Sequence, residues 1–266
     1  MARTFDGTDD QIAFGSEAAI DDLSAYTAAV LVRTTGNVTS ERVLVSKFTA
    51  GFVGTIYLGA TGDGGNNNKV YTYIAGSTAW YAESAVDALI ANTWRVIVAT
   101  WAGGVSVAPQ LWACTLGGTI AELSYTGTPT GGNGRVSDAS ATLRVGARDA
   151  ADATFFAGGL AECAIWNRVL TADEMRALGK GFAPAFFPRG RVFYCPITGR
   201  YSAEPNWAGT THGTVTEATY LTHPQVIYPT DTAPRLFKAS GGGGGSPVIL
   251  DRGGGRALAR SIGRFM

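Results

Sequence analysis

The chain of 266 residues has few of the side chains and motifs that many hydrolases use for catalysis. It contains two histidines, His212 and His223, and no Gly-x-Ser-x-Gly motif accompanies them, so a Ser-His-Asp hydrolase is not expected. It also contains only three cysteines, Cys114, Cys163 and Cys195, which lie far apart and inside apolar segments. This placement predicts buried free thiols, and neither a disulfide framework nor a Cys-x-x-Cys metal motif.

Long apolar runs and strong charge are also absent. No segment approaches the ~20 apolar residues of a membrane span, and the chain does not begin with basic residues followed by an apolar stretch. Charged residues make up 16% of the chain, and the formal net charge is zero. Basic residues are few and gather only near the C-terminus, which argues against nucleic-acid binding. We therefore expect a protein made and folded in a cytoplasm, with neither a membrane nor a nucleic acid as partner.

Glycine is abundant, and short apolar segments alternate with polar turns. The chain has 36 glycines, and 45% of its residues are hydrophobic, which is enough for one substantial core. Several segments show the alternating or continuous apolar residues of β-strands. They span residues 11–14, 24–33, 42–48, 53–59, 69–75, 94–101, 110–116, 143–147 and 155–166. About nine to twelve such strands fit a two-sheet sandwich, in which alternate side chains enter the space between the sheets.

The most informative segment, residues 154–175, is typical of a strand that runs into a short capped helix. Thr171 can serve as the N-cap, and Glu174 can reach back to the N-cap amide to complete a capping box. Gly179 and Gly181 then end the helix. The segment therefore predicts one helix close to the end of an otherwise β-rich region.

This strand and helix resemble the last strand and helix of the laminin-G-like branch of the concanavalin A-like lectin/glucanase jelly rolls. The resemblance covers about residues 3–180. It is also carried by Phe5-Asp6-Gly7, by the strand that ends in Ser46-Lys47, and by Trp94 with Trp101-Ala102-Gly103-Gly104. It implies an all-β, two-sheet antiparallel jelly-roll sandwich with one short C-terminal helix, and it implies no particular reaction.

Two positions of the last strand depart from the family pattern. Where the family commonly has Asp and Arg, this chain has Ala161 and Ala164. Small apolar side chains in place of surface charges have two explanations. Either the outer face of this strand is covered in this protein, or the changes have little effect.

Composition divides the chain into three parts, the first of which, residues 1–182, is the expected sandwich. Residues 183–234 contain seven prolines, too many for continuous central strands or helices, so we expect a proline-rich extension that packs on the sandwich. The extension resembles a segment that often follows such domains in uncharacterised phage and bacterial proteins. Residues 235–266 are a Gly-rich linker and a basic arm with a net charge of +5.

The basic arm is expected to anchor the protein to a partner, because the amphipathic helix predicted for residues 256–266 is too short to be stable alone in water. The residues expected to make this contact are Arg252, Arg256, Leu258, Arg260, Ile262, Arg264 and Phe265. Together with the two resemblances, the arm predicts a phage virion structural protein, such as a capsid decoration, head fibre, neck or tail component. Its partners would be other virion proteins and, in a homo-oligomer, further copies of itself. It would fold in the bacterial host cytoplasm and be located in the virion.

A second hypothesis is a carbohydrate-binding adhesin or module that recognises host-surface glycans. Sugar binding needs flat aromatic faces beside amide or carboxylate groups. The candidate residues, which are close together in sequence, are Tyr71, Tyr73, Trp80, Tyr81, Asn66 and Asn67. The alternative is that these aromatic side chains fill the core or a subunit interface.

Loop carboxylates are candidates for a calcium site. Asp63 lies in a Gly- and Asn-rich loop, and Asp6 is followed closely by Asp9 and Asp10. Carboxylate and amide oxygens are the ligands that calcium prefers. Asx residues that stabilise turns are the commoner reason for such clusters, so calcium remains possible and no other cofactor is expected.

The lack of suitably spaced carboxylate pairs argues against a glycosidase. Glucanases with a sandwich fold use closely spaced carboxylates as nucleophile and general acid. The nearest pairs here, Glu83 with Asp87 and Asp149 with Asp152, lack that strand spacing and are typical of solvated loop acids. We therefore predict that the protein is not an enzyme.

Overall fold

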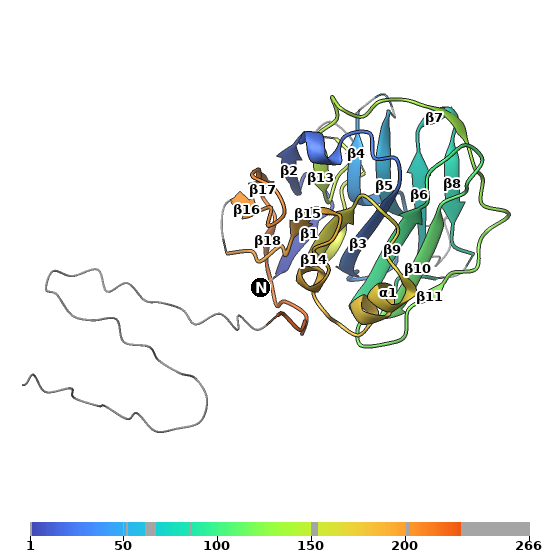
Figure 1. Ribbon diagram of the computed structural model, residues 1–266. Coiled ribbons are helices and arrows are strands. Elements are labelled where there is room, and N and C mark those ends of the chain that lie inside the picture. The colour runs from blue at the N-terminus through green and yellow to red at the C-terminus, as the bar shows by residue number, and fades with distance from the viewer. Residues whose placement is uncertain are drawn as a thin grey trace, which may run out of the picture. The chain divides into compact units, whose positions relative to one another are not determined.

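Two antiparallel β-sheets pack face to face in the part of the chain that the structure, a computed structural model, describes (Figure 1). This part comprises residues 2–49, 51, 53–61, 68–85, 87–149, 154–200 and 203–229. The predicted all-β jelly-roll sandwich is confirmed, and each segment predicted from apolar patterning contains a strand. Within the described residues, no helix has the length and apolar character needed to cross a membrane.

The first sheet has eight strands in the order β11-β10-β9-β3-β14-β1-β18, with β15 paired to β14 beside this path. The long strand β14 lies between β3 and β1, so it is central to the sheet. The strands are β1 (Ala2–Asp6), β3 (Tyr26–Arg33), β9 (Arg95–Trp101), β10 (Gln110–Thr115), β11 (Ala121–Glu122), β14 (Ala157–Trp166), β15 (Arg191–Cys195) and β18 (Thr219–Leu221).

The second sheet also has eight strands, in the order β16-β17-β2-β13-β4-β5-β6-β8, and a small separate sheet pairs β12 with β7. The strands of the second sheet are β2 (Gln11–Gly15), β4 (Arg42–Phe48), β5 (Gly54–Thr61), β6 (Lys69–Ile74), β8 (Trp80–Glu83), β13 (Leu143–Val145), β16 (Ala203–Pro205) and β17 (His212–Thr216). The remaining elements are β7 (Gly76–Thr78), β12 (Asn133–Arg135), α1 (Ala172–Gly179) and the short 3-10 helices η1 (Ala18–Ile20) and η2 (Pro184–Phe186).

The main core lies between the two sheets and follows from the alternation of side chains along each strand. In β3, for example, Ala28, Val30 and Val32 belong to this core. In β5, Ile56 and Leu58 do the same from the other sheet. The intervening residues of both strands point away from the core, so each sheet also has an outer face.

The outer face of the first sheet is covered. A second apolar cluster there joins Ala29 and Leu31 of β3 to Met175 and Leu178 of α1. Ala161 and Ala164 of β14 lie in the same cluster and are fully buried. Their small side chains are therefore explained by covering, the first of the two alternatives, since a charged side chain there would have to be desolvated.

Helix α1 begins with the predicted capping box. Thr171 Oγ1 accepts a hydrogen bond from the Glu174 amide at 3.3 Å, and a Glu174 carboxylate oxygen accepts one from the Thr171 amide at 2.8 Å. Both oxygens of Glu174 also accept hydrogen bonds from Arg168, at 2.6 and 2.7 Å. These bonds lower the pKa of Glu174 to about 2, so the cap remains ionised at neutral pH.

The three cysteines are free and buried, as predicted. Cys163 of β14 and Cys195 of β15 are direct partners across the two strands and belong to the main core. Burial raises the pKa of both thiols. They pack as apolar side chains in the protonated state.

Residues that follow α1 add strands to both sheets. Strand β15 pairs with β14, and β18 pairs with β1 of the first sheet. Strand β17 pairs with β2 of the second sheet, and β16 pairs with β17 at its edge. Pro205 ends the edge strand β16, a place where a missing amide hydrogen is tolerated. The boundaries of the three predicted parts of the chain remain predictions.

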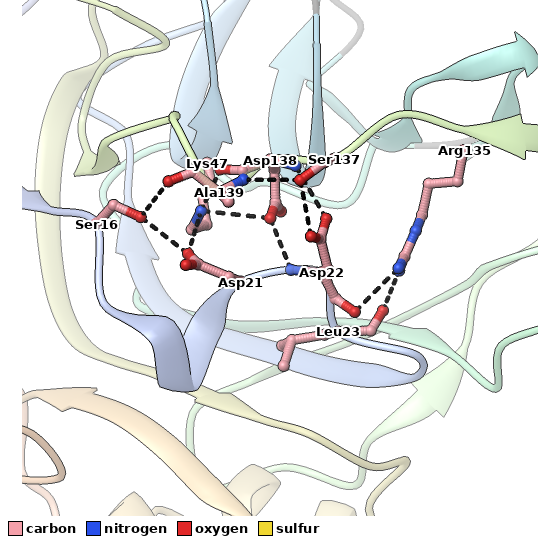
Figure 2. Close-up of polar contacts among 9 residues, drawn as sticks. All are labelled: Ser16, Asp21, Asp22, Leu23, Lys47, Arg135, Ser137, Asp138 and Ala139. Atoms are coloured by element: carbon pink, nitrogen blue, oxygen red, sulfur yellow. Dashed lines mark hydrogen bonds and ion pairs between the residues drawn. The ribbon is translucent and has the colours of Figure 1, made fainter.

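A buried lysine joins three segments near one end of the second sheet (Figure 2). The Lys47 ammonium is fully buried, lies 2.8 Å from Asp21 Oδ1 and 3.3 Å from Asp138 Oδ1, and donates to the Asp138 carbonyl. The backbone amide of Asp22 donates to Asp138 Oδ1 at 2.7 Å, and that of Asp138 donates to Asp22 Oδ1 at 3.0 Å. Strand β4, the β2–β3 connection and the loop before β13 are thereby held together.

A second polar cluster attaches the end of the described chain to β14. Glu162 is buried at a bulge where the register with β3 shifts, and its φ of 52° lies in the left-handed region. Its carboxylate accepts hydrogen bonds from Tyr194, at 2.7 Å, and from Tyr228, and it lies 3.1 Å from His223 Nε2. This cluster holds residues 223–228 against the first sheet.

The Lys47→Met variant is expected to lose about 3–5 kcal/mol of unfolding free energy, because it leaves Asp138 buried without its cation. Urea denaturation measures the loss. Lys180→Met removes an exposed lysine and is the matched control, with a change within about 0.5 kcal/mol. A loss below about 1 kcal/mol in Lys47→Met would show that the ion pairs contribute little.

The contact between His223 and Glu162 predicts a pH-dependent stability. Burial opposes charging of His223, but the hydrogen bond and charge of Glu162 outweigh it and raise its pKa above 6.5. A histidine whose pKa is raised by folding stabilises the folded state below the unfolded pKa, and this stabilisation is lost as the pH rises through the folded pKa.

Melting temperatures measured from about pH 5.5 to 9 are expected to show a wild-type advantage over His223→Gln that is largest at low pH and shrinks as the pH rises. His212→Gln, which changes the exposed histidine of β17, is the control. A difference between wild type and His223→Gln that does not vary with pH would contradict the assigned role of the ion pair.

Candidate functional site

A hollow of about 350 Å³ lies on the outer face of the second sheet, over β5, β6 and β8. This volume is within the range of small-molecule binding sites. We call it the tyrosine hollow, and it is lined by Glu41, Tyr57, Thr61, Tyr71, Tyr73, Tyr81 and Glu83. Unlike the outer face of the first sheet, this part of the surface is lined by aromatic rings and carboxylates.

Strand alternation and register bring these side chains together. Tyr71 and Tyr73 are two residues apart on β6, so both point outward. Tyr73 lies directly opposite Tyr81 of β8, and Tyr71 lies opposite Glu83. The hairpin of β6 and β8 thus places three aromatic rings and a carboxylate on one face.

The inner rings form a packed floor. Tyr57 is 1% exposed and Tyr71 is 9% exposed, and their ring centroids lie 5.4 Å apart. Phe48 of β4 packs edge-on against Tyr57 at 5.1 Å and lies 5.9 Å from Tyr73. Tyr73 and Tyr81 are partly exposed, so their rings are the ones that a ligand can reach.

Gly59 of β5 makes room for Tyr71. The two residues are cross-strand partners, and a Cβ atom on Gly59 would lie 2.7 Å from the Tyr71 ring. Side chains do not approach each other so closely, so any larger residue at this position would displace the ring. The absent side chain of Gly59 is therefore part of the geometry of the hollow.

Glu41 organises the inner hydroxyl groups. Its Oε1 atom accepts hydrogen bonds from Tyr57 and, at 2.5 Å, from Tyr71. Burial raises the pKa of both tyrosines well above 10, and the hydrogen bonds to Glu41 raise it further. Both phenols are therefore protonated at neutral pH, and the Tyr71 hydroxyl also lies 3.0 Å from the Tyr57 hydroxyl.

The outer side of the hollow has a second carboxylate. Glu83 Oε1 lies 3.1 Å from the Lys69 ammonium, and Glu83 Oε2 accepts a hydrogen bond from Tyr81. Lys69 precedes Tyr71 on β6 by two residues, so its side chain emerges from the same face of the strand. The charge of Glu83 is thus balanced by the Lys69 ammonium, and its carboxylate is held in place by the Tyr81 hydroxyl.

Three of the four predicted aromatic site residues, Tyr71, Tyr73 and Tyr81, lie together in the hollow. The expectation for Trp80 is corrected. Trp80 is 2% exposed in the main core, its ring lies 5.6 Å from that of Trp101, and its indole donates to the Gly104 carbonyl at 3.2 Å. Successive residues of a strand point to opposite faces, so Trp80 and Tyr81 cannot both be on the surface.

Four lining residues, Glu41, Tyr57, Thr61 and Glu83, were not among the predicted site residues. Glu83 is not the solvated loop acid that was expected, because it lies on β8 and pairs with Lys69. Tyr57 lies in a predicted strand, but its position beside Tyr71 depends on the register of β5 with β6. Glu41 immediately precedes β4 and enters the hollow from the other side of β5. Alternation along residues 53–59 was the one signal that would have placed Tyr57 on the outer face.

Other predicted site residues have different outcomes. Asp6, Asp9 and Asp10 have carboxylate oxygens within 4.8 Å of one another and could offer ligands to calcium. Burial, with the charges of Asp6 and Asp9, raises the pKa of Asp10, while Asp6 Oδ1 accepts from the Thr8 amide as in an Asx turn. Calcium binding here remains a prediction. The following predicted residues lie outside the described part of the chain: Asn66, Asn67, Asp63, Arg252, Arg256, Leu258, Arg260, Ile262, Arg264 and Phe265.

Two further cavities are less suited to a ligand. One, of about 20 Å³, lies between β3 and α1 and has room for about one water molecule. The other, of about 390 Å³, lies beside the β9–β10 hairpin, where Tyr125 is its one aromatic lining residue. The tyrosine hollow combines comparable space with four aromatic rings, so it is the leading candidate site.

A family model described as the concanavalin A-like lectin/glucanases superfamily matches residues 6–176. No curated protein matches the chain. Among solved structures, a candidate carbohydrate-binding protein of Bacteroides ovatus ATCC 8483 is 15% identical with a TM-score of 0.54, and the match covers 82% of this chain. The chain spans only 58% of the length of that protein, and at this identity the likeness shows the fold alone.

Two other solved structures are similar at lower scores. The heptameric SAP-like pentraxin of Limulus polyphemus is 12% identical with a TM-score of 0.46, over 67% of this chain and 81% of the pentraxin. The enzymatically active domain of tailspike protein 2 of bacteriophage CBA120 is 13% identical with a TM-score of 0.48. That match covers 73% of this chain and 33% of the tailspike chain.

Proposed function

Because the chain belongs to the concanavalin A-like lectin/glucanases superfamily, we propose that it is a carbohydrate-binding protein and that its binding site is the tyrosine hollow. The observation that carries this proposal is the pair Tyr73 and Tyr81, two partly exposed rings directly opposite each other on adjacent strands. Sugars present apolar C–H faces that stack on such rings, while their hydroxyl groups need polar partners at the rim. Glu41, Glu83 and Thr61 supply those partners.

Binding is favoured over hydrolysis by the state of the two carboxylates. Glycoside hydrolysis uses one carboxyl group as general acid and another as nucleophile or base. Here Glu41 Oε1 and both oxygens of Glu83 already accept hydrogen bonds from neighbouring side chains. Release of reducing ends from a polysaccharide, lost in Glu41→Gln or Glu83→Gln, would instead identify the hollow as a glycosidase site.

The predicted role as a phage virion structural protein is a further proposal that places this binding activity on a particle. It is supported by the resemblance of the extension to phage proteins and by the +5 charge of residues 235–266. In this proposal the basic arm attaches the protein to other virion proteins, and the sandwich with its tyrosine hollow is displayed to host-surface glycans.

A glycan array followed by calorimetry tests the binding site. Wild-type protein is expected to bind a defined glycan class. Tyr73→Ala and Tyr81→Ala are each expected to weaken binding by about tenfold, because loss of a stacking ring removes about 1.4 kcal/mol. Tyr220→Ala removes a tyrosine that is 63% exposed on β18 and is the matched control.

Trp80→Ala is unsuitable as a binding variant, because truncation of a core tryptophan costs about 3–5 kcal/mol of stability. Equal affinity of the wild type, Tyr73→Ala and Tyr81→Ala for the glycan would place its binding elsewhere. Binding by none of the proteins to any glycan on the array would refute the proposed function.

The anchoring arm is tested by fusing residues 235–266 to an unrelated carrier protein. The fusion is expected to co-sediment with virions, and attachment is expected to weaken as salt is raised from about 0.1 to 1 M, because screening shortens the Debye length from about 10 to 3 Å. A chain that ends at residue 234 provides the complementary comparison and is expected to remain in the supernatant. Attachment by the truncated chain, with none by the fusion, would contradict the role of the arm.

A further inference from the structure

The tyrosine hollow is rich in hydrogen-bond acceptors and poor in donors. Tyr57 and Tyr71 donate their hydroxyl protons to Glu41, and Tyr81 donates its proton to Glu83. These three phenols therefore present only lone pairs to a ligand. The Thr61 and Tyr73 hydroxyl groups can still donate, but a ligand that bonds to the two carboxylates and the three committed phenols must bring donors of its own.

The charge of the hollow is also unbalanced. Glu83 is paired with Lys69 at 3.1 Å, whereas Glu41 is held by two neutral phenols and has no ion pair with a described residue. Arg148 acts electrostatically on Tyr57, but its guanidinium is paired with Asp149 at 3.8 Å. One carboxylate thus remains without a cation among the described residues, and an anionic ligand would be repelled.

Aromatic rings around an uncompensated carboxylate form a favourable environment for a cation. The faces of tyrosine rings attract ammonium groups, and this attraction adds to the Coulomb attraction of the carboxylate. Tyr57 and Tyr71 are buried and direct their hydroxyl groups at Glu41, so the ring faces open to an ammonium group or a sugar ring are those of Tyr73 and Tyr81. Stacking and ammonium recognition can therefore be satisfied by one ligand.

We propose that the tyrosine hollow selects sugars that carry a protonated amino group and rejects sugars that carry a carboxylate. This inference rests on the proposed carbohydrate-binding function and names the ligand class of the same site. The ammonium group of the sugar donates to Glu41, and the pyranose ring stacks on Tyr73 and Tyr81. Neutral sugars stack on the same rings and use the same polar partners, but they lack the charge-assisted hydrogen bond to Glu41 and therefore bind more weakly.

Calorimetry at about pH 6 with three soluble oligosaccharides of equal length tests the selection. The probes are a glucosamine oligomer, an N-acetylglucosamine oligomer and a galacturonate oligomer. The wild type is expected to bind the glucosamine oligomer at least about tenfold more tightly than the N-acetylglucosamine oligomer, because it gains one charge-assisted hydrogen bond. It is expected not to bind the galacturonate oligomer.

The Glu41→Gln variant keeps the shape of the side chain and removes its charge. It is expected to reduce the preference to within about twofold, because the affinity for the glucosamine oligomer falls much more than the affinity for the N-acetylglucosamine oligomer. Glu122→Gln is the matched control, because Glu122 also accepts a tyrosine hydroxyl, from Tyr125 at 2.7 Å, but lies on β11 of the first sheet. Thermal melts of both variants establish that each is folded.

Each outcome decides a specific point. The proposed selection would be overturned by equal affinities for the three oligomers, by tighter binding of the galacturonate oligomer, or by a preference that persists in Glu41→Gln. In each of these cases Tyr73→Ala still reports whether the hollow binds sugars. Sugar binding that Tyr73→Ala leaves unchanged would overturn both this inference and the assignment of the site. No sugar binding at all by the wild type would overturn the proposed function itself, together with the inference.

Discussion

The two sheets can pack together only if each strand sends alternate side chains into the space between them, and this constraint determines where every other side chain can be. In β5 and β6 it directs Ile56, Leu58, Val70 and Ile74 inward, and it therefore directs the tyrosines between them outward. The aromatic surface of the second sheet is thus a consequence of a well-packed interior. On the first sheet the same alternation produces a second apolar face, which α1 and the later residues cover. One sheet is buried on both faces, and the other keeps an open face.

Two buried charged clusters stabilise parts of the chain that the apolar core cannot hold. Lys47, with Asp21 and Asp138, joins a central strand to two loops at one end of the second sheet. Glu162 attaches the last described residues to β14 through Tyr228 and His223. Buried charges are costly unless they are paired, so these contacts tolerate few alternative arrangements of the segments that they connect. The apolar core supplies most of the stability.

Local patterns were sufficient to predict the two-sheet fold, the capped helix at Thr171 and the burial of the cysteines, because each depends on residues close together in sequence. The outward direction of Tyr71 and Tyr73 was predictable for the same reason. The pairing of Tyr73 with Tyr81, the approach of Glu41 and the room provided by Gly59 depend on register between strands, which a single sequence does not specify. The prediction for Trp80 was wrong because adjacent residues of a strand point to opposite faces. Tyr81 points to the outer face of the sheet, so Trp80 points into the core. The short edge strands of residues 203–221 carry too few apolar residues to produce a pattern.

The position of Cys163 and Cys195 opposite each other in the core has a practical consequence for studies of this protein. A thiol reacts with alkylating reagents as the thiolate, and burial suppresses both ionisation and access at these two positions. Modification of either sulfur in native buffer therefore requires β14 and β15 to separate. The rate of labelling at these two positions, resolved from that at Cys114 of β10, reports the opening of the strand pair to which the end of the described chain is attached, without any introduced probe.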